Sequence, residues 1–117
     1  METPRPSASN ALERTRVVVQ LPVCEATDFD SLVQIENGLI EILAKHRGAR
    51  VDGHEIGRGR FNVFIVSDEP WPSMFGRIRA FLEFRGVLGD AVIATRHVEG
   101  EGYQVLWPPD HGHAFEL

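Results

Sequence analysis

Hydrophobic positions along the chain switch between two periods, and the switches mark where strands and helices alternate. A continuous run of β-branched residues within 16–21, which Pro22 stops, predicts a strand buried in the centre of a sheet. Residues 51–66 hold two β-type runs around a Gly-Arg-Gly turn and predict a hairpin. Residues 91–95 and 103–107 predict two further strands, the last of which ends at a pair of prolines.

Two stretches between these strands carry apolar residues at helical spacing. The first helix is expected to start between Asp28 and Ser31 and to end in the cationic turn Lys45-His46-Arg47 before Gly48. The second is expected to start at Pro70 and to end at Arg85-Gly86. The apolar stripes that predict them are Leu32, Ile35, Leu39, Ile42 and Leu43, and then Trp71, Met74, Phe75, Ile78, Phe81 and Leu82.

Gly38 interrupts the first helical pattern. Glycine inside a helix costs about 1 kcal/mol relative to alanine. A glycine at this position is therefore expected only where something packs closely against its backbone.

The order βαββαββ predicts an α+β fold, a ferredoxin-like split βαβ sandwich with a mainly antiparallel sheet and both helices on one face. Residues 1–15 lack an apolar period and are expected to form a flexible tail. Residues 16–109 are expected to form the single domain, and residues 110–117 a C-terminal tail.

Alternation in the second arm of the hairpin divides its residues between the two faces of the sheet. If Phe61, Val63 and Ile65 face the helices, Phe64 and Val66 face outward, together with Val18 from the first strand. Such a face is too apolar for a solvated sheet, so Phe64 and Val66 are candidate partner-binding residues. Either the fifth strand or the C-terminal tail folds over this face, or a homodimer forms through it.

The first arm of the hairpin carries the candidate chemistry. Asp52 and His54 could stand side by side, with the carboxylate orienting the imidazole as a general base. The same pair is a common structural hydrogen bond, and no Ser or Cys lies at a spacing that marks an activated nucleophile. Gly53 indicates a bulge or a close backbone approach that re-aims His54, while Glu55 projects to the other face.

Arg58 and Arg60 flank the tip of the hairpin, where their guanidinium groups could bind a carboxylate or a phosphate. Two solvated arginines on an exposed turn are the alternative. The glycines around Arg58 do not form a dinucleotide fingerprint, because the third glycine and the following helix are missing.

No metal site or cofactor is expected. His111 and His113 have chelating spacing but lie in a tail after two prolines, where further ligands and a firm backbone are lacking. Cys24 has the acidic neighbours Glu25 and Asp28, which disfavour a reactive thiolate.

Composition narrows the classes of partner. The chain has 117 residues and a formal net charge of -5, which argues against a nucleic-acid surface. The single cysteine and the lack of a signal-peptide pattern or a membrane-spanning run predict a cytoplasmic protein without membrane contact.

Three segments carry a resemblance to a known group: Val-Asp-Gly-His-Glu-Ile-Gly at 51–57, Asn-Val-Phe-Ile at 62–65 and Val-Leu-Trp-Pro at 105–108. Together they resemble short, uncharacterised bacterial proteins with a ferredoxin-like fold, over about residues 17–108. The resemblance implies the fold and a bacterial setting, and it supplies no activity.

The sequence therefore favours a non-enzymatic protein-interaction or regulatory module, for example of the immunity type, that forms a homodimer or binds another protein. The alternative is a small enzyme or small-molecule-binding domain that uses Asp52 and His54.

Overall fold

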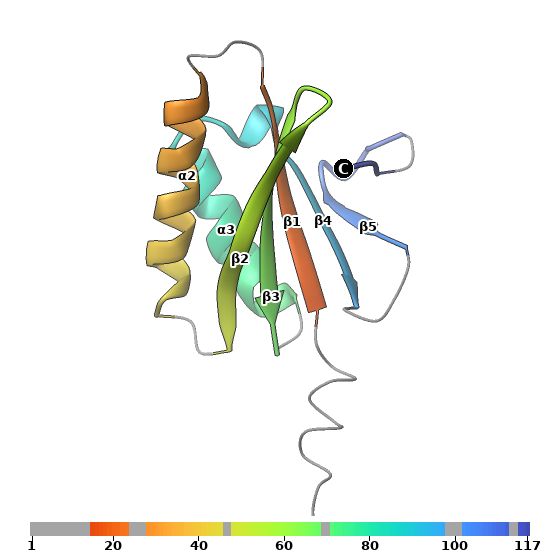
Figure 1. Ribbon diagram of the computed structural model, residues 1–117. Coiled ribbons are helices and arrows are strands. Elements are labelled where there is room, and N and C mark those ends of the chain that lie inside the picture. The colour runs from red at the N-terminus through yellow and green to blue at the C-terminus, as the bar shows by residue number, and fades with distance from the viewer. Residues whose placement is uncertain (1–14, 24–27, 46–47, 69–70, 98–101, 113–114) are drawn as a thin grey trace, which may run out of the picture.

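The computed structural model describes residues 15–23, 28–45, 48–68, 71–97, 102–112 and 115–117. Strands and helices alternate within these ranges much as the hydrophobic periods predict (Figure 1). The elements are β1 (Thr15–Pro22), α2 (Asp28–Leu43), β2 (Ala49–Gly57), β3 (Arg60–Ser67), α3 (Pro72–Phe84), the short 3-10 helix η1 (Leu88–Asp90), β4 (Val92–His97) and β5 (Gln104–Trp107).

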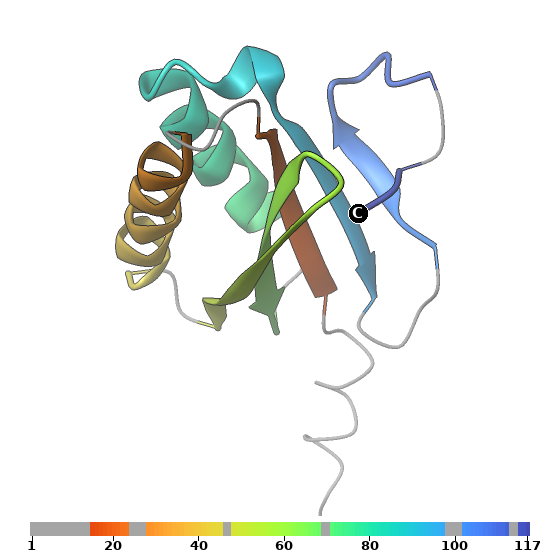
Figure 2. The same cartoon turned by 45° about the horizontal axis from the view of Figure 1, so that its top comes forward.

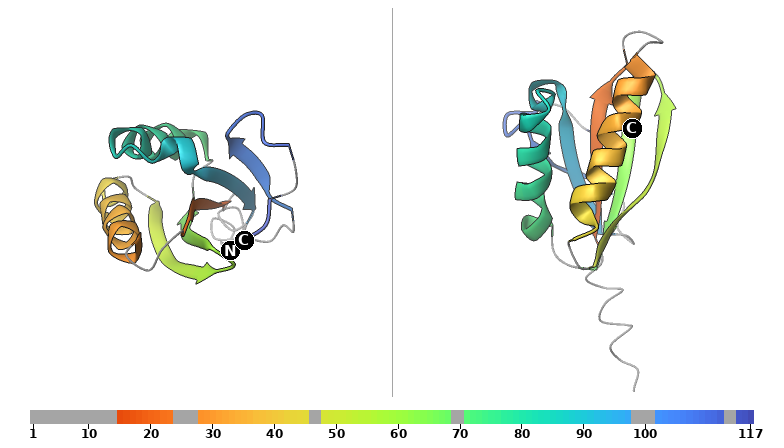
Figure 3. Two further views of the ribbon diagram at one scale, coloured as in Figure 1. Left: turned by 90° about the horizontal axis from the view of Figure 1, so that it is seen from above. Right: turned by 90° about the vertical axis from the view of Figure 1, so that its left-hand side faces the viewer.

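The five strands form one sheet in which every adjacent pair is antiparallel. Their spatial order, β2-β3-β1-β4-β5, differs from their order along the chain. Strands β1 and β2 therefore run in the same direction with β3 between them, and β3 and β4 do so with β1 between them. Both helices lie on the same face of the sheet (Figure 3). The expected α+β class and antiparallel sheet with two helices are confirmed.

The core lies between the helices and the sheet. On the sheet side it contains the inward residues of the two central strands, and on the helix side it contains the apolar stripes that the sequence predicts. These fully or almost fully buried side chains include Val17, Val19, Leu21, Phe61, Val63, Ile65, Leu32, Ile35, Leu39, Leu43, Met74, Ile78 and Leu82. The predicted inward set Phe61, Val63 and Ile65 is thus confirmed.

Both helices are shorter than predicted. Helix α2 ends at Leu43, so Lys45 lies beyond the helix and the expected cationic last turn is wrong. Leu43 is the last residue of this helix that packs into the core, whereas Ala44 and Lys45 are exposed. Helix α3 starts at Pro72 rather than Pro70, which lies outside the described residues. Proline suits either position at the start of a helix, because its missing N–H has no intrahelical partner there.

Gly38 marks the place where the two helices meet. A Cβ atom built on Gly38 would lie 2.3 Å from Cζ of Phe81 in α3. Only a residue without a side chain allows this approach, which is the close packing that the sequence led us to expect.

Candidate functional site

A bulge in β2 shapes the first candidate site. Val51 pairs with Ile65 and His54 pairs with Val63, so Asp52 and Gly53 lie opposite the single residue Phe64. Gly53 adopts the positive φ of 104° that favours glycine. Because of the extra residue, Val51 and His54 both face the helices although they are three positions apart. The predicted bulge is confirmed, and it re-aims His54 as proposed.

His54 meets a carboxylate from α2. Its Nδ1 lies 2.7 Å from Oε1 of Glu36, whose side chain is only 11% exposed, compared with 34% for His54. The imidazole also packs 4.9 Å from the ring centroid of Phe61 and 6.4 Å from that of Phe29. This arrangement holds the ring in one orientation and satisfies a buried carboxylate, which would otherwise destabilise the fold.

Sequence reasoning considered Asp52 and missed Glu36 as the partner of His54. Asp52 lies in the bulge and is exposed. The signal for Glu36 was its position inside the buried stripe of α2, four residues after Leu32 and three before Leu39. A carboxylate at such a position needs a partner from another element.

Other residue types with possible chemistry do not add to this pair. The described residues include no group of three or more His, Cys, Asp and Glu side chains that could hold a metal ion. His113 of the predicted chelating pair, and Cys24, lie outside the described residues.

The hairpin tip is a second candidate site. Arg58 and Gly59 form its two-residue turn with φ values of 57° and 74°, as in a type I′ turn. Arg58 is exposed. Arg60 donates from Nη1 to the main-chain oxygens of Glu116 at 2.8 Å and Leu117 at 3.3 Å. Arg60 thus binds oxygen atoms of this chain's own C-terminal segment, and binding of an external carboxylate or phosphate stays a prediction.

Residues 115–117, which we call the C-terminal segment, lie beside the open face of the sheet, which we define as the face turned away from the helices (Figures 2 and 3). Gln20 donates from Nε2 to the main-chain oxygen of Glu116 at 2.7 Å and to Oδ1 of Asn62 at 3.0 Å. The rings of Tyr103 and Phe115 pack with centroids 5.1 Å apart.

Side chains on this open face are correspondingly buried. Val18 and Ala94 are fully buried, and Asn62 is 2% exposed. Phe64 and Val66, the predicted outward residues, are half-buried. The sequence left three candidates to cover this face: the fifth strand, the C-terminal tail and a second copy of the chain. The C-terminal segment of the same chain lies over part of it.

Of the large apolar side chains that are exposed among the described residues, Phe84 lies at the end of α3 and the others lie on α2 and β2. Phe29, Ile40 and Ile56 are 43%, 47% and 45% exposed, and Val33 lies between the first two on α2. Helical spacing puts Phe29, Val33 and Ile40 on the side of α2 away from Gly38 and therefore away from α3. These four residues form the β2 edge surface, which the sequence analysis did not identify.

Among the described residues, neither helix is both long and apolar enough to cross a membrane. Comparison of the chain with protein-family models, with curated proteins and with solved structures finds no match.

Proposed function

We propose that the protein is a non-enzymatic interaction module with a ferredoxin-like core, and that the edge of β2 pairs with the same edge of a second copy. The observation that carries this proposal is the exposed edge strand, flanked by the apolar residues of the β2 edge surface. An edge strand presents unpaired backbone groups, and a second strand is a natural partner for them.

The ferredoxin-like assignment rests on the two interleaved β-α-β units. Each has parallel strands separated by one strand of the other unit, as in the split βαβ arrangement. Strand β5 is then an addition beside β4. The resemblance to short bacterial proteins fits this assignment and belongs to the same proposal.

Self-pairing of β2 is supported by its pattern of faces. We place the two strands antiparallel across a two-fold axis, with Arg50 opposite Glu55 of the second copy. Because the bulge adds one residue, Arg50 and Glu55 both project to the open face although five positions separate them. Two Arg–Glu pairs then form, one on each side of the axis.

The helix side of this pairing is largely apolar. Val51 lies opposite His54 of the second copy, and Ala49 lies opposite Ile56. The α2 stripes from the two copies then face each other above the paired strands, and their contact covers Phe29, Val33 and Ile40, which are exposed or half-buried in the single chain. Burial of such side chains favours association.

The charges on β2 favour this register over a shifted pairing of the same two strands. A shift that places Val51 opposite Ile56 also keeps side chains on matching faces. That shift brings Asp52 next to Glu55 of the second copy, however, and leaves Arg50 opposite Gly57. Like charges at opposed positions destabilise paired strands, so the register with two Arg–Glu pairs is favoured.

Charge reversal tests this proposal. We expect the wild-type chain to dimerise in sedimentation equilibrium, and Arg50→Glu or Glu55→Arg to weaken the dimer at least about tenfold, equivalent to about 1.4 kcal/mol. The double variant Arg50→Glu/Glu55→Arg restores opposite charges and is expected to recover the dimer.

Arg77→Glu is the matched control, because it makes the same charge change on an exposed residue of α3. It should leave the dimer unchanged. A monomeric wild-type chain at all concentrations, or a double variant as weak as either single variant, would overturn the proposal.

A catalytic or small-molecule site at His54 is the second candidate, supported by the 2.7 Å contact with Glu36. It ranks lower because Phe29 and Phe61 pack against the imidazole, so that the pair already has a structural role in joining α2 to β2.

A further inference from the structure

The C-terminal segment lies against the sheet in the way that a bound peptide would. Phe115 and Leu117 are half-buried, whereas Glu116 between them is exposed. This alternation is typical of an extended segment, in which every second side chain turns toward the same surface. The segment therefore presents two anchoring side chains to the protein and one side chain to solvent.

Side chains of the sheet bind this segment through its main chain. Gln20 donates to the main-chain oxygen of Glu116 at 2.7 Å, and Arg60 donates to the same oxygen at 2.8 Å. Arg60 also donates to the main-chain oxygen of Leu117 at 3.3 Å. The amide of Gln20 is oriented by Asn62, which lies opposite it on β3 and accepts a hydrogen bond of 3.0 Å. Every peptide offers main-chain oxygens, so these donors also suit an extended segment of another sequence.

An aromatic platform adds selectivity to this main-chain recognition. The rings of Phe115 and Tyr103 pack with centroids 5.1 Å apart. On Tyr103, the Cζ atom of Arg96 lies 5.2 Å from the ring centroid, a contact that restrains the ring. Aromatic pairs contribute more to binding than the burial of their surface alone. Tyr103 therefore favours an aromatic residue at the position of Phe115.

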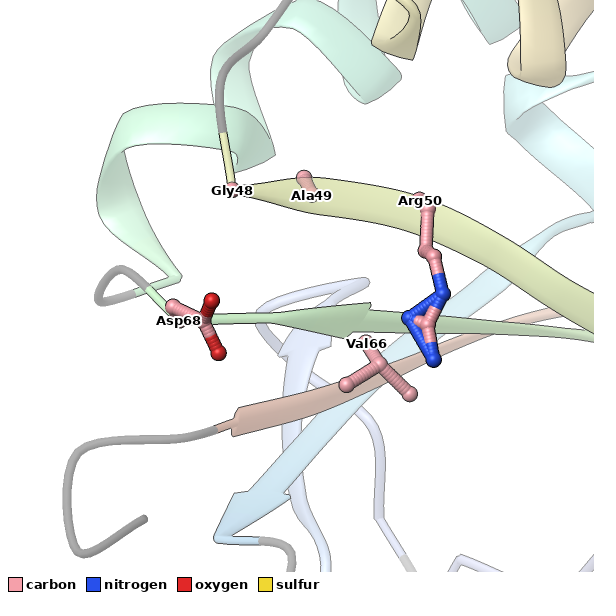
Figure 4. A pocket seen from close by; sticks show the side chains of 5 residues that line it. All are labelled: Gly48, Ala49, Arg50, Val66 and Asp68. Carbon is pink, nitrogen blue, oxygen red and sulfur yellow. The ribbon is translucent and has the colours of Figure 1, made fainter. Parts of the chain in front are cut away.

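A hollow beside Leu117 shows that the segment leaves part of this surface unfilled. Its volume of about 540 Å³ is within the range of about 300–1,000 Å³ for ligand pockets, and its walls are formed by Glu55, Ile56, Gly57, Arg58, Asn62 and Leu117. A smaller hollow of about 230 Å³, with Arg50, Val66 and Asp68 around it, lies at the other end of the hairpin and is not lined by the segment (Figure 4). The larger hollow has room for a side chain bigger than leucine.

We propose that this part of the open face binds an extended peptide segment of a partner protein. The partner carries an aromatic residue at the position of Phe115 and, two residues later, a large apolar residue at the position of Leu117. Its main-chain oxygens bind Gln20 and Arg60, its aromatic ring packs on Tyr103, and its apolar residue enters the hollow. The C-terminal segment of this chain is then a competitor that occupies the surface until the partner displaces it.

The covalent link between the segment and β5 favours the occupied state. Residues 108–114 join the two, and a tether of this length gives an effective concentration on the order of millimolar. A peptide added to the wild-type chain has to compete with this concentration. A substitution that weakens the segment without changing the sheet removes the competition and makes the surface available.

The test measures binding of a fluorescein-labelled peptide with the sequence of residues 110–117 to variants of the whole chain, by fluorescence anisotropy. Phe115→Ala removes the aromatic anchor of the segment and leaves Tyr103 and Arg60 in place. We expect this variant to bind the peptide at least about tenfold more tightly than the wild-type chain, because its surface is free in a larger fraction of molecules. Glu116→Ala is the matched control. Its side chain is exposed, so it should bind the peptide as weakly as wild type.

Two variants made in the Phe115→Ala chain test the recognition itself. Arg60→Met keeps a long side chain but removes the hydrogen-bond donors, and should weaken peptide binding at least about tenfold. Arg77→Met removes a positive charge from an exposed position on α3 and should leave binding unchanged. A peptide in which serine replaces both the phenylalanine and the leucine should not bind.

Thermal unfolding supplies a second readout. The peptide should raise the unfolding temperature of Phe115→Ala more than that of wild type, because it fills a surface from which the weakened segment is released. The proposal is overturned if Phe115→Ala binds the peptide no more tightly than wild type, or if Arg60→Met and Arg77→Met have equal effects.

The peptide surface and the self-pairing proposed for β2 can fail separately. Glu55 borders the hollow and also takes part in the pairing, so the test leaves Glu55 unchanged. Arg50→Glu should weaken the dimer of β2 strands without weakening peptide binding. A wild-type dimer that persists in Arg50→Glu and dissociates when excess peptide is added would replace the partner protein with a second copy that exchanges its C-terminal segment.

Discussion

Gly38 shows how one residue sets the distance between two helices. A side chain at this position would meet the ring of Phe81, with a Cβ to Cζ distance of 2.3 Å. Glycine weakens α2 locally, yet it lets α3 approach so that both apolar stripes reach the same core. The local cost and the tertiary gain therefore belong to the same residue.

Alanine at this position separates these two effects. We expect Gly38→Ala to lower the free energy of unfolding by up to about 2 kcal/mol in urea denaturation, because an overpacking cost of about 1–3 kcal/mol is only partly offset by a gain in helix propensity of about 1 kcal/mol. The control is Gly76→Ala in α3, where nothing lies within 4 Å of an added Cβ. That substitution should raise stability by up to about 1 kcal/mol. Equal effects of the two substitutions would contradict the close helix contact.

Strand β2 presents interacting side chains on both faces of the sheet. Its bulge at Gly53 turns His54 toward Glu36 on the helix side and leaves Arg50 and Glu55 together on the open side. A regular strand would place Arg50 and Glu55 on opposite faces. Both the buried polar contact and the proposed self-pairing therefore depend on this single irregularity.

The backbone of Gly53 is the feature to test in this element. We expect Gly53→Ala to lower the free energy of unfolding by about 1–2 kcal/mol, since its φ of 104° is strained for a residue with a side chain. Gly57→Ala is the control, because Gly57 lies in the same strand with open space around it and without a positive φ. It should change stability by less than about 0.5 kcal/mol. Urea denaturation of both variants measures the difference. If Gly53→Ala leaves the free energy of unfolding unchanged, the positive φ at the bulge is not needed for the stability of β2.

At the scale of the whole molecule, the period of apolar residues predicts the elements well. Each helix or strand buries one side against the same core, so the spacing of apolar residues within its own sequence shows which type of element it is. The stripe from Leu32 to Leu43 and the alternation from Phe61 to Ile65 both fall on the core side as expected. Helix ends are less well predicted. Lys45 would suit the last turn of α2, but the helix ends at Leu43, after which no described residue of this segment is buried in the core.

Contacts between distant segments could not be read from those patterns. The contact of Glu36 with His54 needs both the bulge and the docking of α2. The pairing of Arg16 with Arg96 depends on the register of β1 against β4, which joins residues eighty positions apart. Register is a tertiary property that local composition does not encode.

The return of the C-terminal segment is the longest such contact, and it decides how the open face is covered. Arg60 and Gln20 hold the main-chain oxygens of Glu116 and Leu117, while Val18 and Ala94 are fully buried on the same face. A chain that stops at residue 114 loses these three hydrogen bonds. We expect its free energy of unfolding to fall by about 2–4 kcal/mol, at about 0.5–1.5 kcal/mol for each bond plus the apolar surface that is uncovered.

Glu116→Ala provides the control for this deletion, because Gln20 and Arg60 both bind the main-chain oxygen of Glu116 and the residue is exposed. The substitution should leave stability within about 0.5 kcal/mol of wild type. If the shortened chain instead keeps full stability as a monomer, the segment does not cover the face, and Val18 must be shielded by other parts of the chain. If it keeps stability only by forming a dimer that Arg50→Glu does not weaken, a second copy has replaced the segment on the open face.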